Sequence, residues 1–148
     1  MKRTLLLLAL FGFLFSCKRE MPEDATPLTD SIKDKNWLLI ADSTVSSAGT
    51  VENNYDLLSG CEKDDLVQFK SNKTLVRDEG ATKCNASDPQ TMTIGTWALN
   101  ESSKVLTFTS VEKIDFKIHT LNATNLVLIA VKTVNGVTFT ETATFKVK

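Results

Sequence analysis

The stretch NGVTFTETATFKV, residues 135–147, decides the fold of this chain because a hairpin signal leads directly into an alternating strand. Asn135 and Gly136 both tolerate positive φ, and Asn-Gly is typical of a two-residue hairpin turn. From Val137 to Val147 most apolar side chains recur at every second position, and threonines fill most positions between them. A period of two places the apolar side chains on one face, so the stretch predicts a strand that is half buried.

Similar runs fill the chain from residue 36 onward, and Ile114, Phe116 and Ile118 alternate with polar residues in the clearest of them, 114–121. The other predicted strands are 37–45, 65–70, 74–78, 92–99, 105–110 and 126–133. Most connections are short enough for hairpins, and no ten-residue helical period interrupts the runs. We predict an all-β domain over 35–148, a single antiparallel up-and-down barrel of eight strands. A sandwich of two sheets accommodates the same strands.

The N-terminus has the pattern of a secretory signal. Lys2 and Arg3 precede an apolar run of about a dozen residues, within the roughly 7–15 of such signals and below the roughly 20 that span a bilayer. LFSC, residues 14–17, resembles a bacterial lipobox, in which cleavage before the cysteine leaves an acylated N-terminus. We predict a lipoprotein signal peptide at 1–16 and lipidation of Cys17, for example by palmitate. The alternative is an ordinary signal peptide with an accidental cysteine.

Residues 17–34 predict a flexible, lipid-anchored tether, because they carry many charges and two of the three prolines without an apolar period. The acyl chains would attach the protein to a membrane. We expect a place in the cell envelope, on the outer membrane, with the side left open. Without residues 1–16 the chain has 15 Lys and Arg against 18 Asp and Glu and no basic run, which argues against a nucleic-acid partner.

Two further cysteines, Cys61 and Cys84, would lie in a compartment that permits disulfides. Neither has the Cys-x-x-Cys spacing or the nearby histidines of a metal or redox site. We predict that they form a structural disulfide, which would close the base of the hairpin over 65–78. Two unpaired thiols are the alternative.

The order of short motifs along the chain resembles the lipocalin-like lipoproteins of Bacteroidetes. The motifs are NWLL, DDLVQF, KSNKTLV, GTWAL, LTF and TNLVL, and the resemblance rests on Trp37, Cys61, Asp64, Asp65, Phe69, Cys84, Gly95, Trp97 and Leu106. It covers about residues 36–148 and implies a lipocalin-like β-barrel on a lipid anchor. The Gly-x-Trp of true lipocalins is absent before Trp37, so transport of an apolar ligand does not follow from the resemblance.

The residues that commonly carry catalysis are few. His119 is the single histidine, and its place in the alternation predicts an exposed strand residue. No nucleophile elbow, zinc motif, phosphate loop or dinucleotide fingerprint occurs. Asp64 and Asp65, with Glu62 nearby, predict a solvated turn, because adjacent strand residues point to opposite faces. We expect no enzyme, no metal and no cofactor.

Glu141 interrupts the apolar face of the last strand, between Phe139 and Ala143. A buried carboxylate needs a partner, water or a ligand, and a β-bulge or a place at the barrel mouth would also resolve the conflict. If it contacts a ligand, Glu141 would line a cavity with Trp97, Phe116 and Phe139. Trp37 and Trp97 are alternatively core residues or plugs at a barrel end.

Two hypotheses follow from this pattern. The first is a binding barrel that holds a small apolar or amphipathic molecule. The second is a structural or interaction lipoprotein whose barrel is filled and whose loop 46–63 contacts another envelope protein. A cavity of roughly 300 Å³ or more would favour the first, and a packed centre the second.

Overall fold

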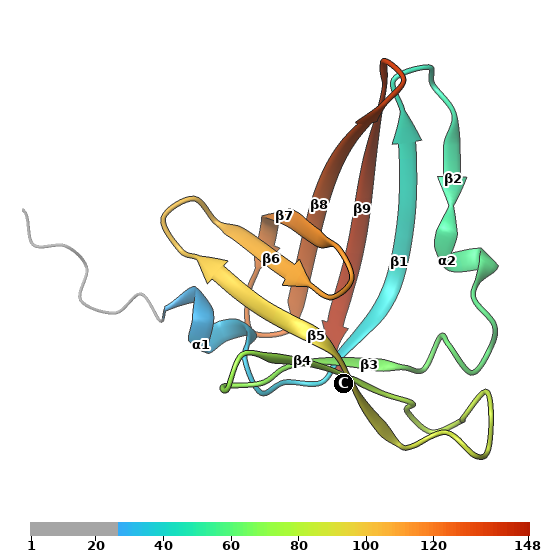
Figure 1. Ribbon diagram of the computed structural model, residues 1–148, viewed down its shortest axis with the longest axis vertical. Coiled ribbons are helices and arrows are strands. Elements are labelled where there is room, and N and C mark those ends of the chain that lie inside the picture. Colours follow the sequence, from blue (N-terminus) through green and yellow to red (C-terminus); the bar gives the residue numbers. More distant parts are fainter. Residues whose placement is uncertain (1–26) are drawn as a thin grey trace, which may run out of the picture.

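A short helix and then a run of antiparallel strands build the domain in the computed structural model, which describes residues 27–148 (Figure 1). The elements are α1 (Leu28–Ile32), β1 (Trp37–Ser46), β2 (Val51–Asn53), α2 (Asn54–Leu57), β3 (Leu66–Phe69), β4 (Thr74–Asp78), β5 (Thr91–Asn100), β6 (Val105–Thr109), β7 (Lys113–Leu121), β8 (Asn125–Val134) and β9 (Val137–Val147). The eight predicted strands are confirmed within one or two residues at their ends. β2 and α2 lie within the segment 46–63, for which the sequence predicts a loop.

The sheet closes on itself because the first and last strands pair along their length. β1 pairs with β9 from Trp37 opposite Val147 to Ser46 opposite Phe139, and each strand from β3 to β8 pairs with the strand that follows it in the chain. β1 also meets β3 through Trp37 and Leu38, which completes the ring, while β2 adds to the far half of β1. All pairs are antiparallel, so the structure is a closed eight-stranded barrel with one extra edge strand.

The apolar core fills one end of this barrel, which we call the closed end. Its fully buried side chains are Ile32, Trp37, Phe69, Leu106, Leu126 and Leu128. The indole nitrogens of both tryptophans are satisfied, since Trp37 Nε1 donates to the Ile32 carbonyl at 2.8 Å and Trp97 Nε1 donates to the Lys70 carbonyl at 3.0 Å. The ring of Phe69 meets that of Trp97 edge to face, with centroids 5.7 Å apart.

The helix α1 belongs to the packed body, although the sequence pattern placed residues 17–34 in a tether. Ile32 is fully buried, Thr29 Oγ1 donates to Glu101 at 2.6 Å, and Asp34 accepts the backbone N–H of Ser71 at 3.1 Å. The folded part thus includes residues 28–34, ahead of the predicted boundary at 35, because one helical turn is too short to show a period. The predicted signal peptide, Cys17 and most of the tether lie outside the described residues. No helix within 27–148 is long and apolar enough to cross a membrane.

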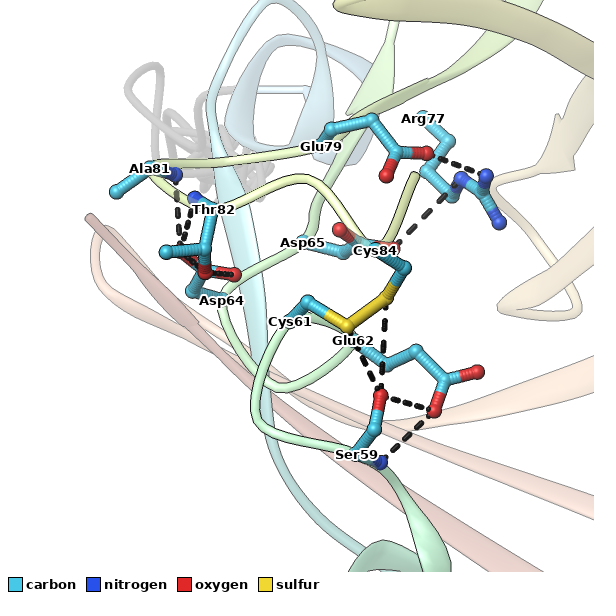
Figure 2. Close-up of a disulfide and its surroundings, with 10 residues drawn as sticks. All are labelled: Ser59, Cys61, Glu62, Asp64, Asp65, Arg77, Glu79, Ala81, Thr82 and Cys84. Atoms are coloured by element: carbon cyan, nitrogen blue, oxygen red, sulfur yellow. Dashed lines mark hydrogen bonds and ion pairs between the residues drawn. A yellow bond between two sulfur atoms is a disulfide. The ribbon is translucent and has the colours of Figure 1, made fainter. Parts of the chain in front are cut away.

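The predicted disulfide between Cys61 and Cys84 is confirmed, with Cα atoms 5.2 Å apart (Figure 2). It ties the segment before β3 to the loop after β4, at the base of the β3–β4 hairpin. Beside it, Asp64 accepts hydrogen bonds from the backbone N–H groups of Ala81 and Thr82, both at 2.9 Å. These contacts hold the loop 79–90 against the start of the hairpin.

Candidate functional site

The barrel wall opens where β7 and β8 separate. β7 pairs with β8 only through Lys117–Leu121 and Leu126–Ile129, and beyond Ile129 the strand β8 keeps β9 as its partner. β1, β8 and β9 therefore project past the other strands, with β2 along the edge of β1 (Figure 1). We call this part the open end; it comprises residues 41–53 and 130–142 together with the β6–β7 turn and the start of β7, 110–115.

Polar side chains line the inner face of the open end. Glu141 on β9 lies opposite Thr44 on β1, and Thr44 lies opposite Glu52 on β2. Asp42 lies opposite Ala143, which is buried in the barrel. Since partners in an antiparallel pair share a face of the sheet, all of these residues face the interior side.

A β-bulge brings Asp42 to this face. The register between β1 and β9 shifts between Leu39 and Ala41, so that Leu39 and Asp42 both lie on the inner side of the strand. A strict period of two would place Ala41 there and Asp42 outside. Alternation therefore does not predict Asp42 as an inward residue, and the residues around Ile40 carry no signal of the bulge.

Two cavities open onto this inner face. The larger, about 460 Å³, lies between the start of β7 and the upper parts of β8 and β9, and is lined by Glu112, Lys113, Ile114, Asp115, Ala130, Val131, Lys132 and Glu141. The smaller, about 230 Å³, is lined by Thr44, Ser46, Ala48, Thr50, Glu52, Val137 and Phe139. The larger cavity falls within the range of small-molecule sites, roughly 300–1,000 Å³.

Glu141 lacks a protein partner at the side of the larger cavity. Among residues 27–148 its carboxylate takes part in no hydrogen bond and no ion pair, whereas Asn54 Nδ2 donates to Thr44 Oγ1 at 2.9 Å and to Asp42 Oδ1 at 3.4 Å. Partial burial, and then the charge of Asp42, raise the pKa of Glu141 above its usual value. The pairing of β9 is regular around Glu141, so a place at the barrel mouth, and not a bulge, accounts for its position.

The four predicted ligand residues lie in different parts of the barrel. Glu141 lines the larger cavity, and Phe139, with 36% of its surface exposed, lines the smaller. Trp97 and Phe116 are buried in the core cluster of the closed end, where the Phe116 and Phe108 rings are 4.7 Å apart. Lys73 Nζ covers the Trp97 ring at 3.9 Å from its centroid. The structure thus places Phe139 and Glu141 on the inner face of the open end. Trp97 and Phe116 lie in the core of the closed end.

The other polar residues considered as candidates are either exposed on a strand or held in contacts within the protein. His119 is exposed, at the irregularity between Ile118 and Thr120 where β7 shifts register against β8. Asp64 binds the loop after β4, and Asp65 lies 3.6 Å from Arg77. Within 27–148 no group of three or more His, Cys, Asp or Glu side chains is arranged to hold a metal ion.

Comparison with known proteins gives one match. A family model described as a lipocalin-like domain matches residues 28–128, which run from α1 into β8. No curated protein and no solved structure gives a significant match.

Proposed function

Because this chain belongs to the lipocalin-like domain family, we propose that it is a lipid-anchored lipoprotein of the cell envelope whose barrel binds a small apolar or amphipathic molecule at its open end. The observation that carries the proposal is the cavity of about 460 Å³ between β7 and β8. Its wall combines apolar surface from Ile114 and Ala130 with charged side chains of both signs, among which Glu141 lies on the inner face of β9. A pocket that joins apolar surface to charged groups can hold an amphipathic molecule in one orientation.

The ligand would occupy only the upper half of the barrel. The closed end is filled by side chains that are almost fully buried, such as those of Trp37, Phe69, Leu106 and Leu128. A ligand therefore binds close to the mouth, with one side in contact with solvent. This shallow geometry suits weak or exchangeable binding better than long-term enclosure.

The anchor is the second part of the proposal, and it rests on the lipobox at residues 14–17 and on the resemblance to the lipoproteins of Bacteroidetes. Cys17 lies ten residues before Pro27, so a fully extended chain would reach at most about 35 Å from the lipid to α1. The substitution Cys17→Ala should release the protein from membranes, because it removes the site of acylation. Membrane fractionation of cells that express either form tests this, and retention of Cys17→Ala would contradict the anchor.

A non-enzymatic interaction lipoprotein is the second candidate, and one observation favours it. A row of β-branched side chains crosses the outer face of the open end, from Val131 through Thr140 and Val45 to Val51. The three valines keep 64%, 43% and 67% of their surface exposed. Exposed apolar surface of this kind suits contact with another envelope protein.

Filling the larger cavity separates the two candidates. The chain from residue 18 contains every described core residue and the disulfide, so it can be produced in an oxidising compartment without the anchor. Native mass spectrometry and extraction would identify a molecule that copurifies. Ala130→Phe places a ring in the larger cavity and should abolish copurification, whereas Ala86→Phe, in an exposed loop, should not change it. Equal copurification with Ala130→Phe would argue against this cavity as the binding site.

A further inference from the structure

The larger cavity combines apolar surface with charged side chains of both signs. Its apolar surface comes from Ile114 at the start of β7 and from Ala130 on β8, beyond the point where the two strands stop pairing. The inner face of the adjoining sheet carries three carboxylates, Asp42, Glu52 and Glu141. Directly opposed Cβ atoms in such a sheet lie about 5 Å apart and diagonal ones about 7–8 Å, so Thr44 separates Glu52 from Glu141 while Asp42 is diagonal to Glu141.

Basic groups do not balance these carboxylates. Lys113 lines the cavity but forms an ion pair with Asp115 at 3.8 Å, and Glu112 adds a further negative charge at the rim. Lys132 is the remaining basic side chain of the cavity wall; it is exposed and forms no ion pair with another described residue. The inner face thus carries three carboxylates, of which Glu141 alone lines the larger cavity, and Lys132 is the one unpaired ammonium of that cavity's described wall.

The surroundings of Glu141 penalise its negative charge. Partial burial and the neighbouring Asp42 both raise its pKa, and no donor within residues 27–148 compensates. A cation placed in the cavity would reverse this penalty, since an opposite charge within about 4–6 Å favours the ionised carboxylate. An anion at the same place would be repelled by Glu141 and by Asp42, which is diagonal to it.

We infer that the open end selects amphipathic molecules with a cationic head, such as an alkylammonium, and that Glu141 receives this head while the apolar body lies against Ile114 and Ala130. The inference rests on the proposed role of the barrel in binding and adds the charge class of its ligand. Glu141 acts as the direct contact, and Asp42 strengthens the negative potential around it. If Lys132 and not Glu141 contacted the head group, the cavity would prefer an anionic head.

Three probes with the same chain and different heads test the inference. Octyltrimethylammonium, octanol and octanoate have apolar chains of nearly equal length and carry a cationic, a neutral and an anionic head. Isothermal titration of the anchor-free chain at neutral pH and low salt should give a dissociation constant for the cation about tenfold or more below that for octanoate, with octanol between them. This ordering follows because the ion pair with a partly buried carboxylate favours the cation and the same charge repels the anion, and about 1.4 kcal/mol corresponds to a factor of ten in affinity.

Charge-removing variants locate the effect. Glu141→Gln should weaken binding of the cation about tenfold and leave octanol unchanged, and Asp42→Asn should weaken the cation less. Asp88→Asn makes the same charge change in the loop 79–90, which lines neither cavity, and should change nothing. Circular dichroism and thermal unfolding of each variant confirm that the barrel is retained.

Each other result has a definite meaning. Tighter binding of octanoate, lost in Lys132→Gln, would overturn the inference and make Lys132 the head-group contact. Equal affinity for all three probes would overturn the charge selection while leaving a binding barrel. Absence of binding by all three would overturn the inference and also count against the proposed function.

Discussion

The closed and open ends of the barrel share the strands β1, β8 and β9 but differ in what these strands carry. At the closed end their inward residues are large and apolar, such as Trp37, Leu128 and Phe145, and the wall is complete. At the open end the inward positions of the same strands hold Thr44, Ala130 and Glu141, and β7 leaves the wall. Side chains large enough to meet across the centre accompany a closed wall, whereas small or charged ones leave room for a cavity.

The largest expected difference between the two ends comes from one substitution made in each. Phe69→Ala removes a fully buried ring that contacts Trp97 and Phe108, and should lower the free energy of unfolding by about 3–5 kcal/mol. Phe139→Ala removes a ring that is 36% exposed in the smaller cavity, and should cost about 1 kcal/mol. Urea denaturation followed by circular dichroism measures both.

Similar costs for the two phenylalanines would show that the open end is as tightly packed as the closed end. Conversely, Phe139→Ala would lose binding of the apolar probe octanol and keep nearly all of its stability if the two ends have separate roles. That result would show that the open end serves binding and the closed end serves stability. The smaller cavity would then belong to the ligand site along with the larger.

The disulfide should stabilise the fold without affecting the open end. Replacing both Cys61 and Cys84 by alanine removes the cross-link between two residues that are 23 positions apart. The free energy of unfolding should fall by about 3 kcal/mol in the chain-entropy model. The hairpin it clamps lies away from both cavities, so probe affinity of the folded fraction should not change. Denaturation and titration of the double variant test the two statements separately, and a large loss of affinity in fully folded protein would contradict the second.

The smallest expected effect concerns Glu141 in the absence of ligand. Its pKa is raised in the folded state, first by burial and then by Asp42. A carboxyl with a raised pKa favours the folded state below its unfolded pKa, and this contribution is lost as the pH rises through the folded pKa. Glu141→Gln should therefore raise the free energy of unfolding at neutral pH, by under about 1 kcal/mol because the site is partly solvated.

At about pH 3 the two proteins should have equal stability, because Glu141 is then protonated in both the folded and unfolded states. Denaturation curves at the two pH values measure the difference. A destabilised Glu141→Gln at neutral pH would instead indicate that the carboxylate has a favourable partner in the folded protein.

The alternation of apolar and polar residues was enough to predict most of the fold, but it predicted little of the candidate site. Strands such as 114–121 and 137–147 follow a local period, so their bounds were correctly predicted from sequence. The cavity depends on non-local facts: the bulge near Ile40 that turns Asp42 inward, and the point at which β7 leaves β8. Alternation correctly places Trp97, Phe116 and Glu141 on the inner face of the sheet. It does not specify the strand register, which decides how far along the barrel axis each residue lies.

The pairing of β1 with β9 also sets the order in which this protein can fold. The hairpins β3–β4, β5–β6 and β8–β9 join neighbours in the chain, but the seam brings Trp37 next to Val147. Contacts between such distant residues form slowly because a long loop must close first. During synthesis β1 therefore stays without its main partner until β9 has left the ribosome. Loss of β9 would leave most of one edge of β1 unpaired, because β3 meets only Trp37 and Leu38 there, and such an edge is prone to aggregation.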